Sequence, residues 1–192
     1  MNNKLTILNQ ILKEINHPIL QIFEESESEK DIENKLGKMK LEINKNLIDL
    51  YLWRGGVNGA SVYDGTFEYF FSFGSFIDIG SAFSLLLLDR KTLKIYDKKL
   101  PFIQSLTGDT VSIDLSSKSS TRGMLLLFSP SLTLSSELMT VYDSIEKWIE
   151  TIIECYKRNA YKMNSDGTLE IDYQLEKEIS LDLNPLSDFW KS

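Results

Sequence analysis

The residue types that most often perform nucleophilic or acid–base chemistry are scarce in this chain. Its 192 residues include one histidine, His17, and one cysteine, Cys155. A serine or cysteine nucleophile normally needs a histidine as its base, and a protein zinc site needs several histidines or cysteines. One of each cannot build either arrangement, and a lone cysteine cannot form a disulfide within the chain. We therefore predict no enzyme activity, no catalytic residue, no metal site and no cofactor.

Both residues have simpler roles. His17 precedes Pro18 at the end of a predicted helix, where a surface or capping role is expected. Cys155 lies in a strongly helical segment with nothing nearby in sequence to lower its pKa, so an inert buried thiol is expected. Carboxylates are plentiful, and a glycosidase-like pair can occur in any acidic protein. An enzyme that uses Asp109 and Asp114 is therefore kept as a minor alternative.

The charge balance is acidic. There are 28 acidic and 21 basic residues, and the net charge is −7. Because such a chain repels phosphate backbones, we expect no direct binding of nucleic acid. Residues 137–192 hold 12 acids and 6 bases, and residues 24–33 form a second, local acidic run. Either surface could meet a basic partner.

Length and composition indicate one ordinary globular domain over residues 1–192, because 42% of the residues are hydrophobic and 26% are charged. The N-terminus does not have the pattern of a secretory signal. The longest apolar run, residues 85–88, is far shorter than the roughly 20 residues that cross a bilayer. With a single thiol as well, the sequence favours a cytoplasmic protein with no membrane partner.

The N-terminal third predicts helices. Apolar residues at three- and four-residue spacing predict a helix over residues 4–16, which Pro18 ends. A serine followed three residues later by an acid is typical of a helix N-cap, so Ser26 or Ser28 is expected to begin a second helix. Gly37 is its expected stop. The acidic run is then either the solvated start of this helix or an acidic contact surface.

A third helix is predicted to begin at Asn44 or Asn46 and to end at Gly55 and Gly56. Trp53, at its end, is expected to be a core residue that anchors this turn to the sheet. The glycines that follow do not form a phosphate loop, because no strand precedes them and no helix with a Lys-Ser/Thr pair follows.

The middle of the chain predicts mostly β-structure. Residues 66–73 are dense in aromatic side chains and predict a strand or hairpin, whereas residues 81–89 predict a helix capped by Ser81. Three strand patterns follow. Pro101 indicates that the first of them begins there or lies at a sheet edge. The third, residues 123–128, is a nearly unbroken apolar run and predicts a central strand. These patterns cover residues 100–106, 110–115 and 123–128 and suggest an antiparallel meander.

The C-terminal third carries the strongest helix signal, over residues 142–160, with Trp148 as a structural residue. A hairpin with its turn at residues 164–167 follows. A last helix is predicted over residues 173–182. We expect Trp190 to hold the remaining tail against the fold.

Several short motifs follow one another in a definite order along the chain. They are Ile32-Glu33 with Leu36-Gly37, residues 47–53 into Gly55-Gly56, Leu100-Pro101 with Phe102-Ile103, Gly108-Asp109 into residues 113–115, the helix at 144–153, and Asn184-Pro185 to Trp190. Their order resembles the SUKH superfamily of Smi/Knr-like proteins, and the likeness covers about residues 22–190. The chain departs from the family at Leu41-Glu42, where Leu-Pro is frequent, and at Gly55-Gly56, where Asn-Gly is frequent.

The resemblance implies an α+β fold: a mostly antiparallel or mixed sheet of about five to six strands with N-terminal helices and a long C-terminal helix packed on it. Similar bacterial proteins are immunity proteins that bind a cognate toxin, often a nuclease or another nucleic-acid-modifying domain, and block it without catalysis. An acidic protein suits a basic toxin, because complementary charge speeds association. Some eukaryotic relatives are regulatory scaffolds, so a scaffold that binds another cellular protein is the alternative.

The exposed sheet face and its neighbouring loops are the expected docking surfaces for such a partner. The contact residues predicted there are Tyr63, Asp64, Glu68, Asp78, Asp109 and Asp114. Taken singly, each of them is more typical of an ordinary solvated loop. Residues expected to have structural roles are Trp53, Gly55, Gly56, Pro101, Trp148, Asn184, Pro185 and Trp190.

Overall fold

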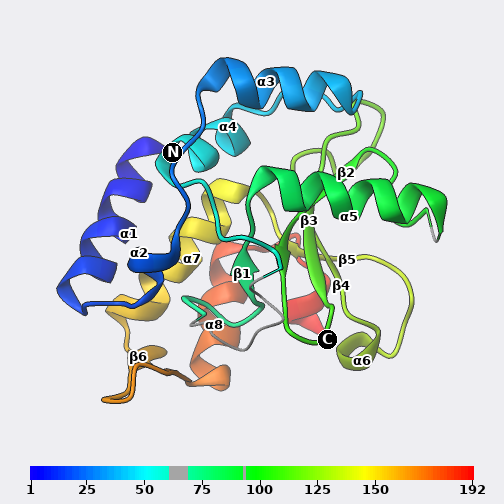
Figure 1. Cartoon of the computed structure of the whole chain (residues 1–192). Coiled ribbons are helices and arrows are strands. Elements are labelled where there is room, and N and C mark those ends of the chain that lie inside the picture. The colour runs from blue at the N-terminus through cyan, green and yellow to red at the C-terminus, as the bar shows by residue number, and fades with distance from the viewer. Residues whose placement is uncertain (61–68, 93) are drawn as a thin grey trace.

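The computed structural model describes residues 1–60, 69–92 and 94–192 (Figure 1). Its helices are α1 (Asn2–Glu14), α2 (Ile19–Ile22), α3 (Glu29–Lys38), α4 (Lys45–Trp53), α5 (Ile79–Lys91), α6 (Pro130–Thr133), α7 (Ile145–Lys157) and α8 (Tyr173–Leu183), with a short 3-10 turn, η2, at Phe189–Lys191. Its strands are β1 (Ser75–Phe76), β2 (Lys99–Gln104), β3 (Thr110–Asp114), β4 (Leu125–Phe128), β5 (Met139–Tyr142), β6 (Tyr161–Met163) and β7 (Leu169–Ile171).

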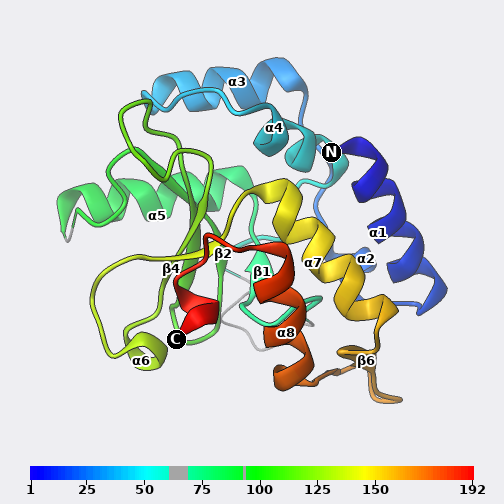
Figure 2. The ribbon, with the colours of Figure 1, turned by 180° about the vertical axis from the view of Figure 1, so that it is seen from behind.

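The fold is α+β, as predicted. The first five strands form one sheet in the order β1-β2-β3-β4-β5, and every neighbouring pair is antiparallel. Strands β6 and β7 form a separate hairpin. Figures 1 and 2 show α5 on one face of the sheet and α7 with α8 toward the other. One buried apolar cluster joins residues from Leu5 in α1 to Trp190 in η2.

Both faces of the middle strands are covered. Every residue of β3 is buried, and so is every residue of β2 except the half-buried Lys99. Strands covered on both sides are rich in Val, Ile and Leu, as these are. The expectation that an exposed sheet face binds the partner is therefore wrong for β2 and β3.

The predicted helix starts are mostly confirmed. Side chains of Ser28, Asn44 and Ser144 accept hydrogen bonds from backbone N–H groups in the first turns of α3, α4 and α7. The start of α5 differs from the prediction, because Asp78 rather than Ser81 caps it. One Asp78 oxygen accepts from the N–H groups of both Gly80 and Ser81, so the helix begins two residues earlier.

Gly37 does not stop its helix. Helix α3 continues to Lys38, and Lys40 is the residue with positive φ that turns the chain away. A Cβ atom added at Gly37 would meet nothing within 4 Å. We therefore expect Gly37→Ala to raise the free energy of unfolding by about 0.5–1 kcal/mol, because alanine is the better helix former. Urea unfolding measures this, and an unchanged or lowered midpoint would contradict it.

Gly55 and Gly56 have the structural role that the sequence predicts. A Cβ at Gly55 would lie 2.2 Å from the carbonyl oxygen of Glu25, and one at Gly56, where φ is +85°, would lie 2.5 Å from the backbone of Ile77. Backbone hydrogen bonds join Gly55 N to Glu24 O and Glu24 N to Gly56 O. The glycines therefore let the chain after α4 run against the segment that precedes α3.

Pro101 lies inside β2 rather than at its first residue, but on an edge portion. It pairs with Ser112 of β3 on one side. On the other side β1 pairs only with Ile103 and Gln104. Since proline has no N–H to donate, this unpaired portion of β2 suits it. Strand β4, predicted as central, is an interior strand, and the central one is β3.

The aromatic segment after residue 68 is not a strand. Phe70 and Phe71 are fully buried in a turn that precedes β1, and both rings pack against Trp148 of α7. Trp148 also meets Phe102 of β2, so its predicted structural role is confirmed. Trp53 is only half-buried and packs against Phe23 instead of anchoring its turn to the sheet.

Candidate functional site

Of the six predicted contact residues, Tyr63, Asp64 and Glu68 lie outside the described residues. Asp114, at the end of β3, is fully buried. Its carboxylate accepts hydrogen bonds from Ser116 N and Thr121 Oγ1. Burial alone would raise the pKa of Asp114, but hydrogen bonds from the surrounding loop lower it. The prediction that Asp114 contacts a partner is therefore wrong, because it is an internal anchor for the β3–β4 loop.

Asp78 and Asp109 differ from one another in their surroundings. The Asp78 carboxylate is engaged on both oxygens, since it caps α5 and also accepts from Ser81 Oγ and Gly59 N. Asp109 is half-buried in the β2–β3 turn, where its side chain accepts from Ser105 Oγ and Thr107 Oγ1. Of these two, Asp109 is the one that borders a surface hollow described below.

A mainly apolar hollow lies between α6, α8 and η2, which are neighbours in both Figure 1 and Figure 2. We call it the C-terminal pocket. Its volume is about 520 Å³, within the range of small-ligand sites. It is lined by Ser72, Phe73, Leu132, Tyr173, Glu176, Lys177, Phe189, Trp190 and Ser192.

Three rings form one wall of this pocket. The ring centroids of Phe73, Phe189 and Trp190 lie 4.9–5.6 Å apart, and the rings stand at steep angles to one another. Such edge-to-face contacts hold aromatic rings in fixed positions. Tyr173, at the first residue of α8, is 70% exposed and adds a fourth ring.

Glu176 is the unusual member of this lining. It is 1% exposed, although it belongs to the helix that the sequence shows as strongly acidic. Its Oε1 atom accepts hydrogen bonds from Ser72 Oγ and from Tyr161 Oη, the latter at 2.5 Å. Burial raises the pKa of Glu176, and these two hydrogen bonds oppose that rise. The pocket therefore combines aromatic walls with a buried carboxyl group.

A second hollow of about 300 Å³ continues from the pocket, because both are lined by Ser72, Phe73 and Leu132. It reaches the β2–β3 turn, where Asp109 and Leu106 line it. Several large apolar side chains are exposed in or next to the segments that line these two hollows, and such exposed apolar groups mark a candidate interaction surface. They are Leu106, Leu132, Leu134, Tyr173 and Leu186.

The same end of the molecule carries unneutralised negative charge. We call it the α8 acidic surface and define it by the exposed residues Glu170, Asp172, Glu178, Asp182 and Asp188. Within the described part of the chain none of the five forms an ion pair. The acids of α7 differ, because Glu146 and Glu150 both pair with Lys4 of α1 at 3.0 Å.

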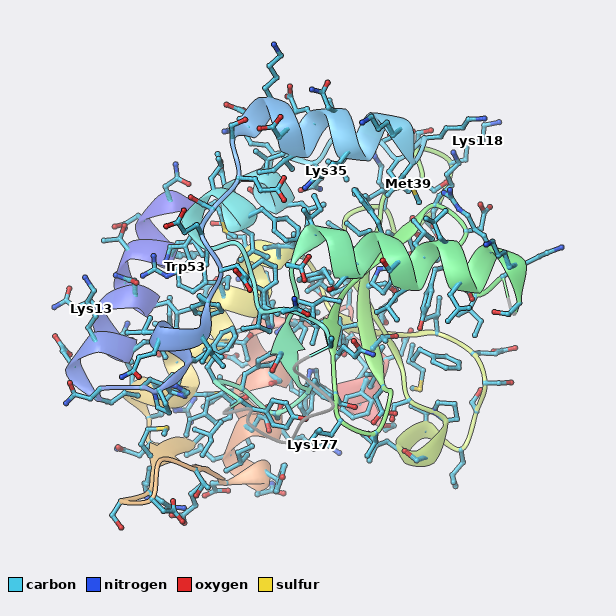
Figure 3. The ribbon with its side chains drawn as sticks, in the orientation of Figure 1. Lys13, Lys35, Met39, Trp53, Lys118 and Lys177 are labelled. Atoms are coloured by element: carbon cyan, nitrogen blue, oxygen red, sulfur yellow. The ribbon has the colours of Figure 1, made fainter. Side chains whose placement is uncertain are left out.

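The acidic run before α3 borders a different hollow, of about 440 Å³, lined by Glu24, Glu25, Trp53 and Arg54 among others. Figure 3 shows Trp53 and Lys177 in separate parts of the molecule, so this hollow is remote from the C-terminal pocket. Arg54 lies over the Trp53 ring, with its guanidinium carbon 5.7 Å from the centroid. This arginine offsets part of the local negative charge.

Cys155 has the environment of an inert thiol, as the sequence predicts. It is fully buried in α7, and burial raises its pKa to about 12, so the thiol stays protonated and unreactive at neutral pH. In the described ranges no three His, Cys, Asp or Glu side chains are grouped closely enough to hold a metal ion. None of the helices described is both long and apolar enough to span a bilayer.

The C-terminal pocket cannot be predicted from the sequence alone, although one signal for it is present. In α8 the buried positions are Glu176, Ile179 and Ser180. Glu176 lies three and four residues before Ile179 and Ser180, and this spacing places the glutamate on the face of α8 that packs against the core. The other members come from distant segments, which only the tertiary fold brings together.

No protein-family model matches this sequence, and a search of curated proteins finds no match either. The C-terminal pocket and the α8 acidic surface therefore stand on their own geometry.

Proposed function

We propose that this chain is a SUKH-like immunity protein, which binds a basic bacterial toxin and blocks it without catalysis. The motif order described above supports the family. The α8 acidic surface carries the functional proposal, because its five exposed carboxylates form no ion pair with the described residues and lie on or next to α8 and η2, which also line the apolar pocket. Charge complementarity then speeds encounter, and apolar contact holds the complex.

The proposed contact area runs from the α8 acidic surface across the C-terminal pocket to Asp109. A stable complex of standard size buries about 800 Å² on each partner, which this end of the molecule can supply together with its neighbours. Asp109 thereby keeps its proposed role as a contact residue. A nuclease or other nucleic-acid-modifying toxin is the preferred partner, because enzymes that bind nucleic acid present basic surfaces.

Co-expression with the toxin encoded by each adjacent gene tests the proposal. The expected result is rescued growth and a complex that survives gel filtration. Failure of every adjacent candidate to bind or to be neutralised would overturn the immunity function. A complex with a cellular protein that has no toxic activity would instead support the scaffold alternative.

A charge-reversal pair tests which acidic surface is used. Glu178→Lys with Asp182→Lys is expected to slow association with the toxin about tenfold at low salt, and less at high salt, because salt screens exposed charges. Stopped-flow mixing measures the rate. Neither side chain forms an ion pair within the described residues, so the melting temperature should stay close to that of the native chain.

The matched control is Glu29→Lys with Glu33→Lys on α3, which changes the net charge by the same amount at the other acidic run. If this control slows association as much as the α8 variant, the effect comes from net charge alone. If only the control slows it, the toxin uses the surface near α3 and the proposed contact area is wrong.

A further inference from the structure

The C-terminal pocket has a second property that toxin binding does not require. Its buried carboxyl group faces a chamber walled by aromatic rings. Glu176 Oε1 already accepts two hydrogen bonds, and Oε2 has no hydrogen-bond partner among the described residues. Because Glu176 lines the pocket, its carboxyl group can accept a hydrogen bond from a charged donor that enters there, and such charge-assisted hydrogen bonds are strong.

The surrounding rings specify the charge of that donor. Phe73, Tyr173, Phe189 and Trp190 all line the pocket. The faces of aromatic rings attract cations, and clusters of such rings are used to bind ammonium groups that carry methyl or alkyl substituents. Anionic ligands are disfavoured beside a carboxylate, and wholly apolar ligands would cover this group without supplying a counter-charge.

The geometry also distinguishes between kinds of cation. A guanidinium group binds best through two parallel hydrogen bonds to both oxygens of a carboxylate. Here Ser72 and Tyr161 occupy Oε1, which leaves one oxygen and therefore one strong contact. An ammonium group needs only one such contact and fills the remaining space with apolar substituents.

We propose that the C-terminal pocket binds an alkylammonium ion, with Glu176 as its counter-charge and the four rings as its walls. This inference does not depend on the proposed immunity function. The ion could belong to a free small amine or to a lysine side chain of a protein. The ammonium group of Lys177 does not fill this role, because it is held by the carbonyl oxygen of Ser192 at 2.6 Å.

Calorimetry with two probes tests the pocket and separates the two sources. The probes are choline and a short peptide with one central lysine and blocked ends. The neutral carbon isostere of choline, dimethylbutanol, is the control for apolar binding. Choline alone binding identifies a small amine as the ligand, whereas tighter binding of the peptide identifies a protein lysine. If neither probe binds, or if dimethylbutanol binds as tightly as choline, the proposal is overturned.

Two variants test the assigned roles. Glu176→Gln keeps an oxygen for Ser72 and Tyr161 but removes the charge, and is expected to weaken binding of the probe about tenfold or more. Tyr173→Leu is expected to weaken it about two- to fivefold, and Tyr173→Phe, which keeps the ring, should change it less than twofold. Because Tyr173 is 70% exposed, its variants remain informative if Glu176→Gln fails to fold. Undiminished binding by Tyr173→Leu or by a folded Glu176→Gln would contradict the proposal.

A pH series adds a readout that a purely structural glutamate would not give. Because burial raises the pKa of Glu176, its protonated form persists to higher pH than that of an exposed glutamate. Affinity for the probe should therefore increase as pH rises, and this dependence should vanish in Glu176→Gln. The other titratable groups near Glu176 are Tyr142, Tyr161 and Cys155, whose pKa values are all raised, and Lys177 at the pocket wall. The two tyrosines and the thiol therefore stay uncharged at neutral pH, and a pH dependence that persists in Glu176→Gln would overturn the assignment.

Discussion

Removing residues 184–192 is expected to lower the free energy of unfolding by at least about 3–5 kcal/mol, the cost of losing one large buried aromatic side chain. Trp190 is 6% exposed and its ring packs against Phe73 and Tyr142. For a chain of this size the loss corresponds to a fall of roughly 10 °C in melting temperature. Differential scanning calorimetry measures it.

Hydrogen bonds add to this loss. The Asn184 side chain donates to Thr151 Oγ1 and Ser180 O, each at 3.0 Å, and accepts from Asp143 N at 3.1 Å. Ser187 Oγ donates to the carbonyl oxygen of Thr140 in β5. Without the tail these buried partners have no substitute inside the fold. Pro185, by contrast, is exposed and is not expected to contribute.

The matched control deletes only residues 191–192. Both are exposed, and the hydrogen bonds that are lost run from Lys177 Nζ to Ser192 O and from Ser192 N and Oγ to the carbonyl oxygen of Phe189. This shorter deletion should change the unfolding free energy by less than about 0.5 kcal/mol. Equal melting temperatures for the native chain and the longer deletion would show that the tail does not hold the fold together.

The sequence was most informative where one local rule determines the structure. Ser28, Asn44 and Ser144 cap their helices because a short polar side chain can reach an N–H group three residues on. The hairpin of β6 and β7 follows from a turn at residues 164–167, which local preference also determines.

Predictions failed where distant segments decide the outcome. Strand β5, Met139–Tyr142, was not predicted because four residues are too few to show a strand period, and its pairing with β4 fixes it. Asp114 looked like a surface acid because the loop that covers it is polar in sequence. Phe70 and Phe71 alternate poorly and are held by Trp148, which lies far along the chain. Tertiary packing overrides local pattern at each of these places.

The candidate site shows the same difference between features that local sequence determines and features that tertiary packing determines. The acidic character of α8 is plain from sequence, since residues 170–190 contain six acids and one lysine. That one of those acids, Glu176, is buried against Tyr161 and Ser72 is a consequence of where α8 lies. A charge count therefore predicts an acidic surface but not the pocket at its edge.

Acidification from pH 6.5 to pH 4 is expected to cost the native chain about 3 kcal/mol through His17 alone. The ring is 1% exposed, which corrects the expected surface position, and its Nδ1 atom accepts from Ile19 N at the start of α2. Burial lowers the pKa of His17 to about 4, and the nearby backbone of Tyr69 opposes this. The folded state then keeps the ring neutral where the unfolded chain takes up a proton.

The direction of the pH effect on the free energy of unfolding follows from this difference in protonation. Above pH 6.5 neither state holds the proton and the contribution to stability is complete. As pH falls toward 4 the unfolded chain gains a proton that the folded chain does not, so the free energy of unfolding decreases. His17→Asn keeps an acceptor for Ile19 N but does not titrate. Urea unfolding of both proteins across this range isolates His17, because other groups cancel in the difference; parallel curves would contradict the assignment.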